Sequence, residues 1–345
     1  MGRYMPLRIA YWTSSFEPEM EAIASEVAIL RRNFPYSVAW GLSHRHWLLL
    51  SWRRGYCLNP RAHLLFRLAT RIVEPAFNLN HIFGSLGDWF YLTGGRKRPV
   101  VLTMATHDPP ANNSLLKSID RFVVECPGAI EDLRDLGIEE GRIRLIFPPV
   151  DLIRFSPGTA PKEPFTVLFA SSPDTAEWLD ARGVPQILDA AMLRPKMRFR
   201  LLWRPWGNSA ARVREWIGER GLQNVELLVK CIDDMASEYN KAHVTLAPFS
   251  DANRSKAAPN SVVESLACGR PVLMTQGVGL SEFICEGRAG KSCGATGEAL
   301  AEHLDQLSAD WEAYSRRARL LAEKSFGVEK FIRAYQCLYS EVLSE

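Results

Sequence analysis

Short apolar runs alternate with amphipathic stretches along most of the chain. This alternation is typical of βαβ units and therefore of parallel sheets. In the first half, the strands that it predicts are residues 7–12, 79–83, 100–104, 121–124 and 143–147. The helices predicted between these strands are residues 18–33, 61–75 and 127–136. A proline-rich segment at 147–164 follows, and we expect it to be a linker.

The alternation restarts after the linker and predicts a second sheet of the same kind. Its expected strands are residues 166–170, 199–203, 225–229, 244–247 and 271–274. Its expected helices are residues 184–193, 210–220, 235–241, 260–267 and 298–307. A final helical pair is expected at 310–323 and 328–343. The last helix carries an apolar stripe, which requires a surface to pack against: Phe331, Tyr335, Leu338 and Val342.

These patterns predict an α/β protein with two Rossmann-like, doubly wound parallel-sheet domains that face a cleft. We expect residues 1–158 to form the first domain and residues 159–325 the second, with residues 326–345 as a helix that crosses back to the first. A length of 345 residues agrees with two domains, because single cores stop growing near about 250–300 residues.

Composition narrows the class of protein. Hydrophobic residues make up 47% of the chain and charged residues 23%, which excludes a disordered chain, a coiled coil or a collagen-like rod. No apolar run reaches the roughly 18 residues that a membrane-spanning helix needs, and residues 1–10 make a poor signal peptide. The seven cysteines are scattered without a C-x-x-C pair, so we expect reduced thiols, no metal site and a cytoplasmic protein.

Positive charge is concentrated in one stretch. Residues 31–100 hold eleven Lys and Arg against Glu74 and Asp88, a local net charge of +9. Trp40, Trp47 and Trp52 lie among these cations, and Arg with Trp suits an anionic membrane surface. A solvated face with a buried aromatic core is the alternative. No nucleic acid is expected as a partner, because the chain contains no recognisable nucleic-acid-binding module.

The most informative segment for chemistry is the helix expected at 260–267. In open parallel sheets, ligands bind beyond the carboxyl ends of the strands. Pro259, Asn260 and Ser261 can start this helix there, with two polar caps and backbone N–H groups directed at an anion such as a diphosphate. Glu264 follows one turn later on the same side, where its carboxylate can accept hydrogen bonds from sugar hydroxyls.

Four segments together resemble the retaining GT-B glycosyltransferases of family 4, which use nucleotide-sugar donors. Residues 264–272 resemble that family's E-A-x-A-x-G-x-P-V signature, and residues 278–284 its G-G-x-x-E-x-I stretch. Residues 143–157 are similar to its V-I-P-N-G-V-D-x-x-x-F-x-P segment, and residues 174–190 to its K-G-x-x-x-L-x-x-A segment. The resemblance covers roughly residues 120–342.

The resemblance implies transfer of a sugar from a nucleotide-diphosphate donor to a glycan, lipid-linked or small-molecule acceptor. The transfer would retain the anomeric configuration and use neither a metal nor another cofactor. The second domain would bind the donor and the first the acceptor. Arg182 matches the family's phosphate-binding lysine, Glu264 its second motif glutamate, and His107 approximates a first-domain histidine near the donor sugar.

The chain also departs from the family pattern. Lys256 stands eight residues before Glu264, where the family has its first glutamate, and Ser172 replaces an arginine after the first strand of the second domain. We therefore expect Lys256, and Arg204 after the next strand, to supply charge toward the phosphates.

Plainer interpretations of single residues stay open. Arg182 is equally compatible with a surface charge, His107 with a structural turn before two prolines, and Ser172 with a turn residue. For the whole chain, the alternatives are a catalytically degenerate protein that binds a nucleotide sugar without turnover and a basic nucleic-acid-binding protein. We expect a cytoplasmic enzyme that lies peripherally at the inner membrane face.

Overall fold

The computed structural model describes residues 7–92, 96–106, 116–251 and 256–345. The chain forms two compact units. Unit 1 comprises Met1–Phe147 together with Glu329–Glu345, and unit 2 comprises Pro148–Val328. The sequence predicts these boundaries at 158/159 and 325/326, and the compact units divide at 147/148 and 328/329.

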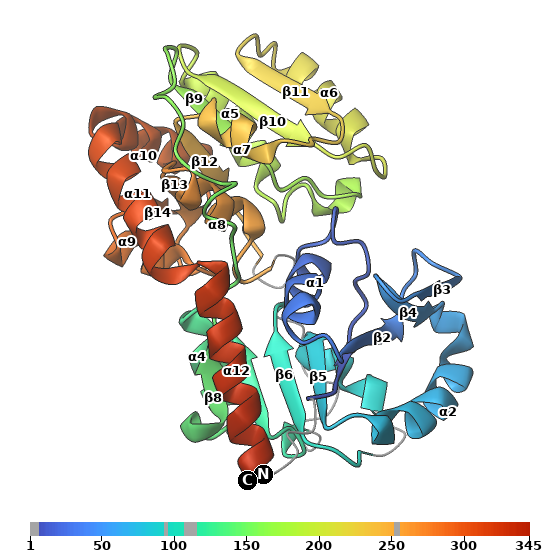
Figure 1. Ribbon diagram of the computed structural model, residues 1–345. Coiled ribbons are helices and arrows are strands. Elements are labelled where there is room, and N and C mark those ends of the chain that lie inside the picture. The colour runs from blue at the N-terminus through green and yellow to red at the C-terminus, as the bar shows by residue number, and fades with distance from the viewer. Residues whose placement is uncertain (1–6, 93–95, 107–115, 252–255) are drawn as a thin grey trace. The chain divides into compact units, whose positions relative to one another are not determined.

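Unit 1 contains an eight-stranded sheet in the order β3-β4-β2-β1-β5-β6-β7-β8 (Figure 1). Its strands are β1 Ile9–Trp12, β2 Val38–Leu42, β3 Leu48–Ser51, β4 Gly55–Leu58, β5 Leu79–Gly84, β6 Val100–Met104, β7 Arg121–Val124 and β8 Ile143–Leu145. Its α-helices are α1 Ala22–Asn33, α2 His63–Val73, α4 Gly128–Asp135 and α12 Val328–Ser344. All neighbouring strands pair in parallel except β3 and β4, which form an antiparallel hairpin.

The strands β2, β3 and β4 were not predicted. The sequence between residues 33 and 61 shows aromatic and basic residues, and we interpreted them by charge and not by periodicity. The helix expected at 18–33 begins only at Ala22, because the Glu21 carboxylate accepts hydrogen bonds from the backbone N–H groups of Phe16 and Glu17 at 2.9 Å and closes a loop there.

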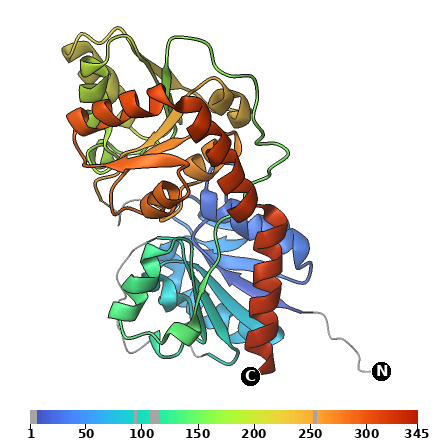
Figure 2. The same ribbon diagram turned by 90° about the vertical axis from the view of Figure 1, so that its left-hand side faces the viewer.

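One face of the unit 1 sheet is covered by α1 and α12. The apolar stripe of α12 lies in the core beside Tyr11, and Tyr335 and Tyr339 are fully buried. Figure 2 shows this last helix, in red, running along the unit 1 sheet. The buried hydroxyls are paired, since the Tyr339 hydroxyl lies 2.7 Å from His81 Nδ1 and the Tyr335 hydroxyl 2.8 Å from the Thr103 hydroxyl. Burial lowers the pKa of His81 to about 3, so its imidazole is neutral in this core.

Unit 2 contains a six-stranded, all-parallel sheet in the order β11-β10-β9-β12-β13-β14. Its strands are β9 Thr166–Phe169, β10 Arg198–Trp203, β11 Val225–Val229, β12 Val244–Ala247, β13 Val272–Thr275 and β14 Gly290–Cys293. Its α-helices are α5 Val184–Leu193, α6 Ser209–Glu219, α7 Met235–Asn240, α8 Asn260–Ala267, α9 Ser281–Glu286, α10 Gly297–Ala309 and α11 Trp311–Ser325. The described residues also form 3₁₀ helices. Four lie in unit 1, at Pro60–Ala62, Glu74–Ala76, Leu86–Leu92 and Glu140–Arg142, and one lies in unit 2, at Ala176–Trp178.

The strand order of unit 2 places its topological switch point between β9 and β12. From β9 the chain winds outward to β10 and β11, and it then returns to β12 and winds the other way. Loops that leave the carboxyl ends of these two strands therefore diverge, and this is where open α/β sheets bind ligands. The expected fold class, two doubly wound parallel α/β domains, is confirmed. Within the described residues, no helix is both long enough and apolar enough to cross a bilayer.

Candidate active site

Three loops meet at the switch point of unit 2. Ser171 and Ser172 follow β9, Arg204 follows β10, and Ser261 lies in the first turn of α8. The Ser171 hydroxyl lies 2.8 Å from the Ser261 hydroxyl, and the backbone N–H of Arg204 donates to the Ser172 hydroxyl at 3.2 Å. Through these contacts Ser171 and Ser172 join three separate segments, and Ser172 is the one that the sequence analysis named as a donor ligand or a turn residue. Ser172 itself is buried.

A tight turn positions Arg182 at the same end of the sheet. Gly183, with a φ of 70°, lies between Arg182 and α5, and a Cβ on it would meet the carbonyl oxygen of Pro248 at 2.0 Å. Only glycine fits this left-handed, closely packed position. The backbone N–H groups of Arg182 and Gly183 donate to the carbonyls of Trp178 and Asp180, each at 3.0 Å, and these two hydrogen bonds hold the turn.

The Arg182 guanidinium is a desolvated cation beside a second cation. It lies over the Phe249 ring, 5.2 Å from its centroid, and its Nε is buried with no hydrogen-bond partner among the described residues. Burial, and next to it the charge of Arg204, lower the pKa of Arg182 to about 10, against the opposing effect of Asp174. At neutral pH the side chain stays charged, and an anion here would relieve both the burial and the repulsion.

The start of α8 differs from the expectation. The residue that caps the helix is Pro259, and neither Asn260 nor Ser261 caps it with its side chain. Both residues already belong to the helix: Ser261 contacts Ser171, and Asn260 Oδ1 is buried without a hydrogen-bond partner among the described residues. The backbone N–H groups of a first helical turn lack helical acceptors, so α8 still directs N–H donors to this place.

Glu264 is a carboxyl group in a desolvated position. The fully buried hydroxyl of Tyr239, from α7, donates to Glu264 Oε2 at 2.9 Å. Burial raises the pKa of Glu264 to about 7, although the Tyr239 hydrogen bond and the charges of Arg154 and Arg204 act in the opposite direction. The group therefore changes its charge near neutral pH.

The structure brings together Ser172, Arg182, Arg204, Ser261 and Glu264, through the hydrogen bonds and charge interactions above. Asn260 belongs to the same first turn of α8. Lys256 is half-buried in the segment that leads into α8. The next residue, Ala257, packs its carbonyl against Gly279, where a Cβ would approach to 2.2 Å. His107 lies outside the described residues.

Three further residues belong to this site and were missed. Arg154 lies within the quoted segment 143–157, and its guanidinium donates to the Asp233 carbonyl at 3.1 Å and stacks 5.2 Å from the Phe155 ring centroid. Phe249 lies two residues after the end of β12, and the switch-point rule could have singled it out. The sequence gives no indication of a role for Tyr239, because its contact with Glu264 depends on how α7 packs against α8.

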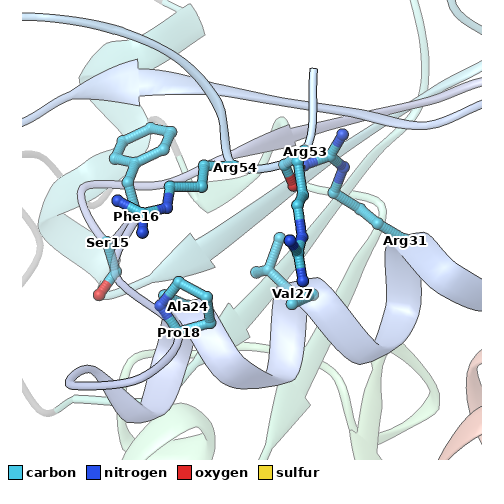
Figure 3. Close-up of a pocket in the computed structure, with 9 residues that line it drawn as sticks. Ser15, Phe16, Pro18, Ala24, Val27, Arg31, Arg53 and Arg54 are labelled. Atoms are coloured by element: carbon cyan, nitrogen blue, oxygen red, sulfur yellow. The ribbon is translucent and has the colours of Figure 1, made fainter. Parts of the chain in front are cut away.

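Unit 1 has a second, basic hollow that the sequence did not reveal. It lies where the loop after β1 (Ser15, Phe16) meets α1, and Arg31, Arg53 and Arg54 line it (Figure 3). Arg31 donates to the backbone carbonyls of Arg53 at 3.0 Å and Trp52 at 2.6 Å, which holds the β3–β4 turn over α1. Among the described residues, no group of three or more His, Cys, Asp or Glu side chains is arranged to hold a metal ion.

Comparison with known proteins agrees with this geometry. The model of the family "Glycosyl transferases group 1" matches residues 169–310, which span the switch point of unit 2. A comparison with curated protein sequences finds no significant match.

Solved structures of glycosyltransferases share the whole architecture. Sucrose-phosphate synthase from Thermosynechococcus elongatus superposes with a TM-score of 0.78 at 16% identity, over 98% of this chain and 99% of that one. HepE from Anabaena, in complex with UDP, gives a TM-score of 0.76 at 13% identity, over 97% of this chain and 100% of that one. A glycosyltransferase from Rickettsia africae gives 0.75 at 15% identity, over 99% of both chains. The chain therefore has the GT-B fold, and its second unit contains a domain that matches the group 1 glycosyltransferases.

Proposed function

We propose that this protein transfers a sugar from a nucleotide-diphosphate sugar to an acceptor, with retention at the anomeric carbon and without a metal. The observation that carries the proposal is the desolvated Arg182 beside Arg204 at the switch point of unit 2. A desolvated Arg182 with the exposed cation of Arg204 near it is unfavourable on its own, and a diphosphate bound by both arginines would offset the desolvation and the repulsion. HepE, one of the structural neighbours, was solved with UDP and with UDP-glucose, which supports a donor of this class.

Each part of the site has a role in this proposal. Arg182 and Arg204 grip the diphosphate, and the first turn of α8 at Asn260 and Ser261 donates backbone N–H groups to it. Glu264 accepts hydrogen bonds from ribose hydroxyls in its ionised form. Lys256 adds positive charge from the segment before α8, and His107 contacts the donor sugar.

The chemistry then rests on stabilising the leaving group. The bond between the anomeric carbon and the diphosphate oxygen breaks, and the arginines stabilise the charge that develops on that oxygen. The acceptor hydroxyl attacks the same face of the sugar and passes its proton to the departing diphosphate, so configuration is retained. No side chain has to form a covalent sugar intermediate.

The acceptor is assigned to unit 1. The hollow lined by Arg31, Arg53 and Arg54 opens at the carboxyl end of β1 and suits an anionic group on a glycan, lipid-linked or small-molecule acceptor. We place the reaction in the cytoplasm, peripherally at the inner face of the membrane.

A second candidate function is binding of a nucleotide sugar without turnover. It is favoured by Lys256, which stands where the resembled family has its first glutamate. Release of free nucleotide from a donor sugar, in the presence of candidate acceptors, separates the two functions, because a degenerate protein binds the donor and releases no product.

Titration with nucleotides tests the proposed site. UDP, GDP and their sugars are added to the protein and to an Arg182→Gln variant while the unfolding temperature is followed, since a ligand of the native state raises it by mass action. We expect one nucleotide class to raise the unfolding temperature, with about tenfold or greater loss of affinity in the variant. Arg214→Gln, which changes an exposed arginine on α6, is the control. Equal affinities of all three proteins would overturn the proposed phosphate site.

A further inference from the structure

The outward side of α2 is apolar although it is exposed. Phe66 anchors the helix to unit 1, with its ring 6.1 Å from that of Trp12 and 5.8 Å from that of Tyr91. Successive residues of an α-helix are rotated by about 100° around its axis, so Leu64, Leu68 and Ile72 point away from Phe66. These three side chains are 65%, 59% and 79% exposed. A solvated helix has polar residues on its outer side, so α2 has a second apolar face that is exposed among the described residues of unit 1.

Strand register places further exposed apolar residues on the same side of the sheet. Residues that are paired directly across neighbouring strands lie on the same face of a sheet. The pairs are Trp12–Trp40, Trp40–Tyr56 and Tyr56–Leu50, so Leu50 on the edge strand β3 lies on the same face as Trp12 on β1. Since Phe66 packs on Trp12, Leu50 lies on the side that α2 covers, as does Leu48 two residues before it. Leu48 and Leu50 are 53% and 72% exposed.

Tryptophans and arginines border this apolar surface. Trp47 and Trp52 flank β3 and are 69% and 66% exposed. Arg61, Arg67 and Arg71 lie on α2 or directly before it, and the chain has no acidic residue between His44 and Val73. Arg71 lies within about 20° of Leu64 around the axis of α2, so cationic and apolar groups are directed the same way.

We propose that α2 and β3 form a docking surface for an anionic lipid bilayer, which takes up the leucines, Ile72 and the two tryptophans while the arginines bind lipid phosphates. A bilayer interface is the partner that satisfies both groups at once, because it places hydrocarbon directly beneath negative charge. A polynucleotide would pair the arginines and leave the leucines in water. A second copy of this chain would bury the leucines and set its arginines against one another.

This inference does not depend on the proposed sugar transfer. The surface belongs to unit 1 and the diphosphate site to unit 2, so lipid binding is measured without donor and donor binding without lipid. If the transfer is real, docking would bring unit 1 to lipid-linked acceptors at the membrane surface.

Vesicle sedimentation tests the surface. The full chain is mixed with vesicles of phosphatidylcholine alone or of phosphatidylcholine with phosphatidylglycerol. We expect strong preference for the anionic vesicles, and about tenfold or greater loss of partitioning in a Leu64→Gln, Leu68→Gln double variant. Leu320→Gln is the control, because Leu320 is similarly exposed, at 63%, on α11 of unit 2. An Arg61→Gln, Arg71→Gln variant should lose the preference for anionic over neutral vesicles.

Three results would overturn the inference. The first is equal partitioning of the native protein into both kinds of vesicle, and the second is unchanged binding of the leucine double variant. The third is that the native protein is a dimer and binds no vesicles, while the double variant is a monomer. That result would assign the surface to contacts between copies of the chain. Unfolding temperatures of all variants show whether they are folded, and exposed positions should leave these temperatures nearly unchanged.

Discussion

Single side chains at the switch point of unit 2 carry desolvated charge. Burial shifts the pKa of both Arg182 and Glu264 toward the neutral form of each group, and these shifts occur where three loops meet. Structural ion pairs in the same unit behave differently: the charges of Arg200 and Lys241 hold the pKa of Glu238 below its usual value, although burial opposes them. Groups that lack such compensation are typical of ligand sites.

Glu264 predicts how stability depends on pH. Its carboxyl has a pKa of about 7 in the folded state and about 4.5 when unfolded, so the native state binds more protons between these values. Stability therefore falls as pH rises from about 4.5 to about 7 and levels off above that. The difference corresponds to at most roughly 3 kcal/mol. A Glu264→Gln variant keeps an acceptor for the Tyr239 hydroxyl and should lack this loss.

Thermal unfolding of both proteins at pH 5 and pH 8 checks this prediction. At pH 8 the variant should unfold at a higher temperature than the native protein, and at pH 5 the two unfolding temperatures should be equal. Glu302→Gln on the exposed side of α10 is the matched control for neutralising a carboxyl at the surface, and it should change the unfolding temperature little at either pH. A gain of equal size at both pH values would show that Glu264 does not titrate as proposed.

How much of the site could be predicted depends on whether a contact is local in sequence. The position of α8 and the place of Glu264 one turn into it follow from local pattern. The Ser171–Ser261 hydrogen bond joins residues 90 positions apart, and it diverts Ser261 from the capping role that its position suggested. The Tyr239–Glu264 bond joins neighbouring helices through their packing. Local pattern contains no information on either contact.

At the scale of elements, periodicity located most strands of both sheets but missed β2, β3 and β4 in unit 1 and the edge strand β14 in unit 2. The strands β6, β7, β11 and β12 begin and end where the pattern placed them, because each is a short segment made mostly of apolar and β-branched residues. In contrast, β3 exposes two leucines that its pattern would have assigned to a core. Because these leucines are exposed, the hydrophobic pattern does not predict the strand correctly. The same exposure supports the docking role proposed for it.

The turn before α5 gives a prediction for one element. Gly183→Ala would force a Cβ against the Pro248 carbonyl at 2.0 Å in a left-handed conformation, so it should destabilise unit 2 by about 2–4 kcal/mol and displace Arg182. Gly218→Ala in α6 is the matched control, since nothing lies within 4 Å of the added Cβ, and it should stabilise the protein by up to about 1 kcal/mol. Urea unfolding measures both changes, and a neutral Gly183→Ala would contradict the close approach.

At the scale of the whole molecule, the order of elements along the chain does not match the unit in which each element packs. The last helix follows unit 2 in sequence, yet Phe331 and Tyr335 lie in the core of unit 1 with 3% and 0% of their surface exposed. Unit 1 is therefore complete only when the entire chain has been made. Its stability should depend on residues that are distant in sequence from its sheet.

Calorimetry of a Phe331→Ala variant checks this dependence. The substitution removes a buried ring from the unit 1 core and should cost about 3–5 kcal/mol there. It leaves every residue of the proposed diphosphate site unchanged. We expect the unit 1 unfolding transition to move to lower temperature, while the nucleotide that stabilises the native protein still raises the unit 2 transition in the variant. Phe283→Ala, which removes a partly exposed ring from α9 in unit 2, should have the reverse effect. Equal losses in both transitions from Phe331→Ala would mean that the two units unfold as one.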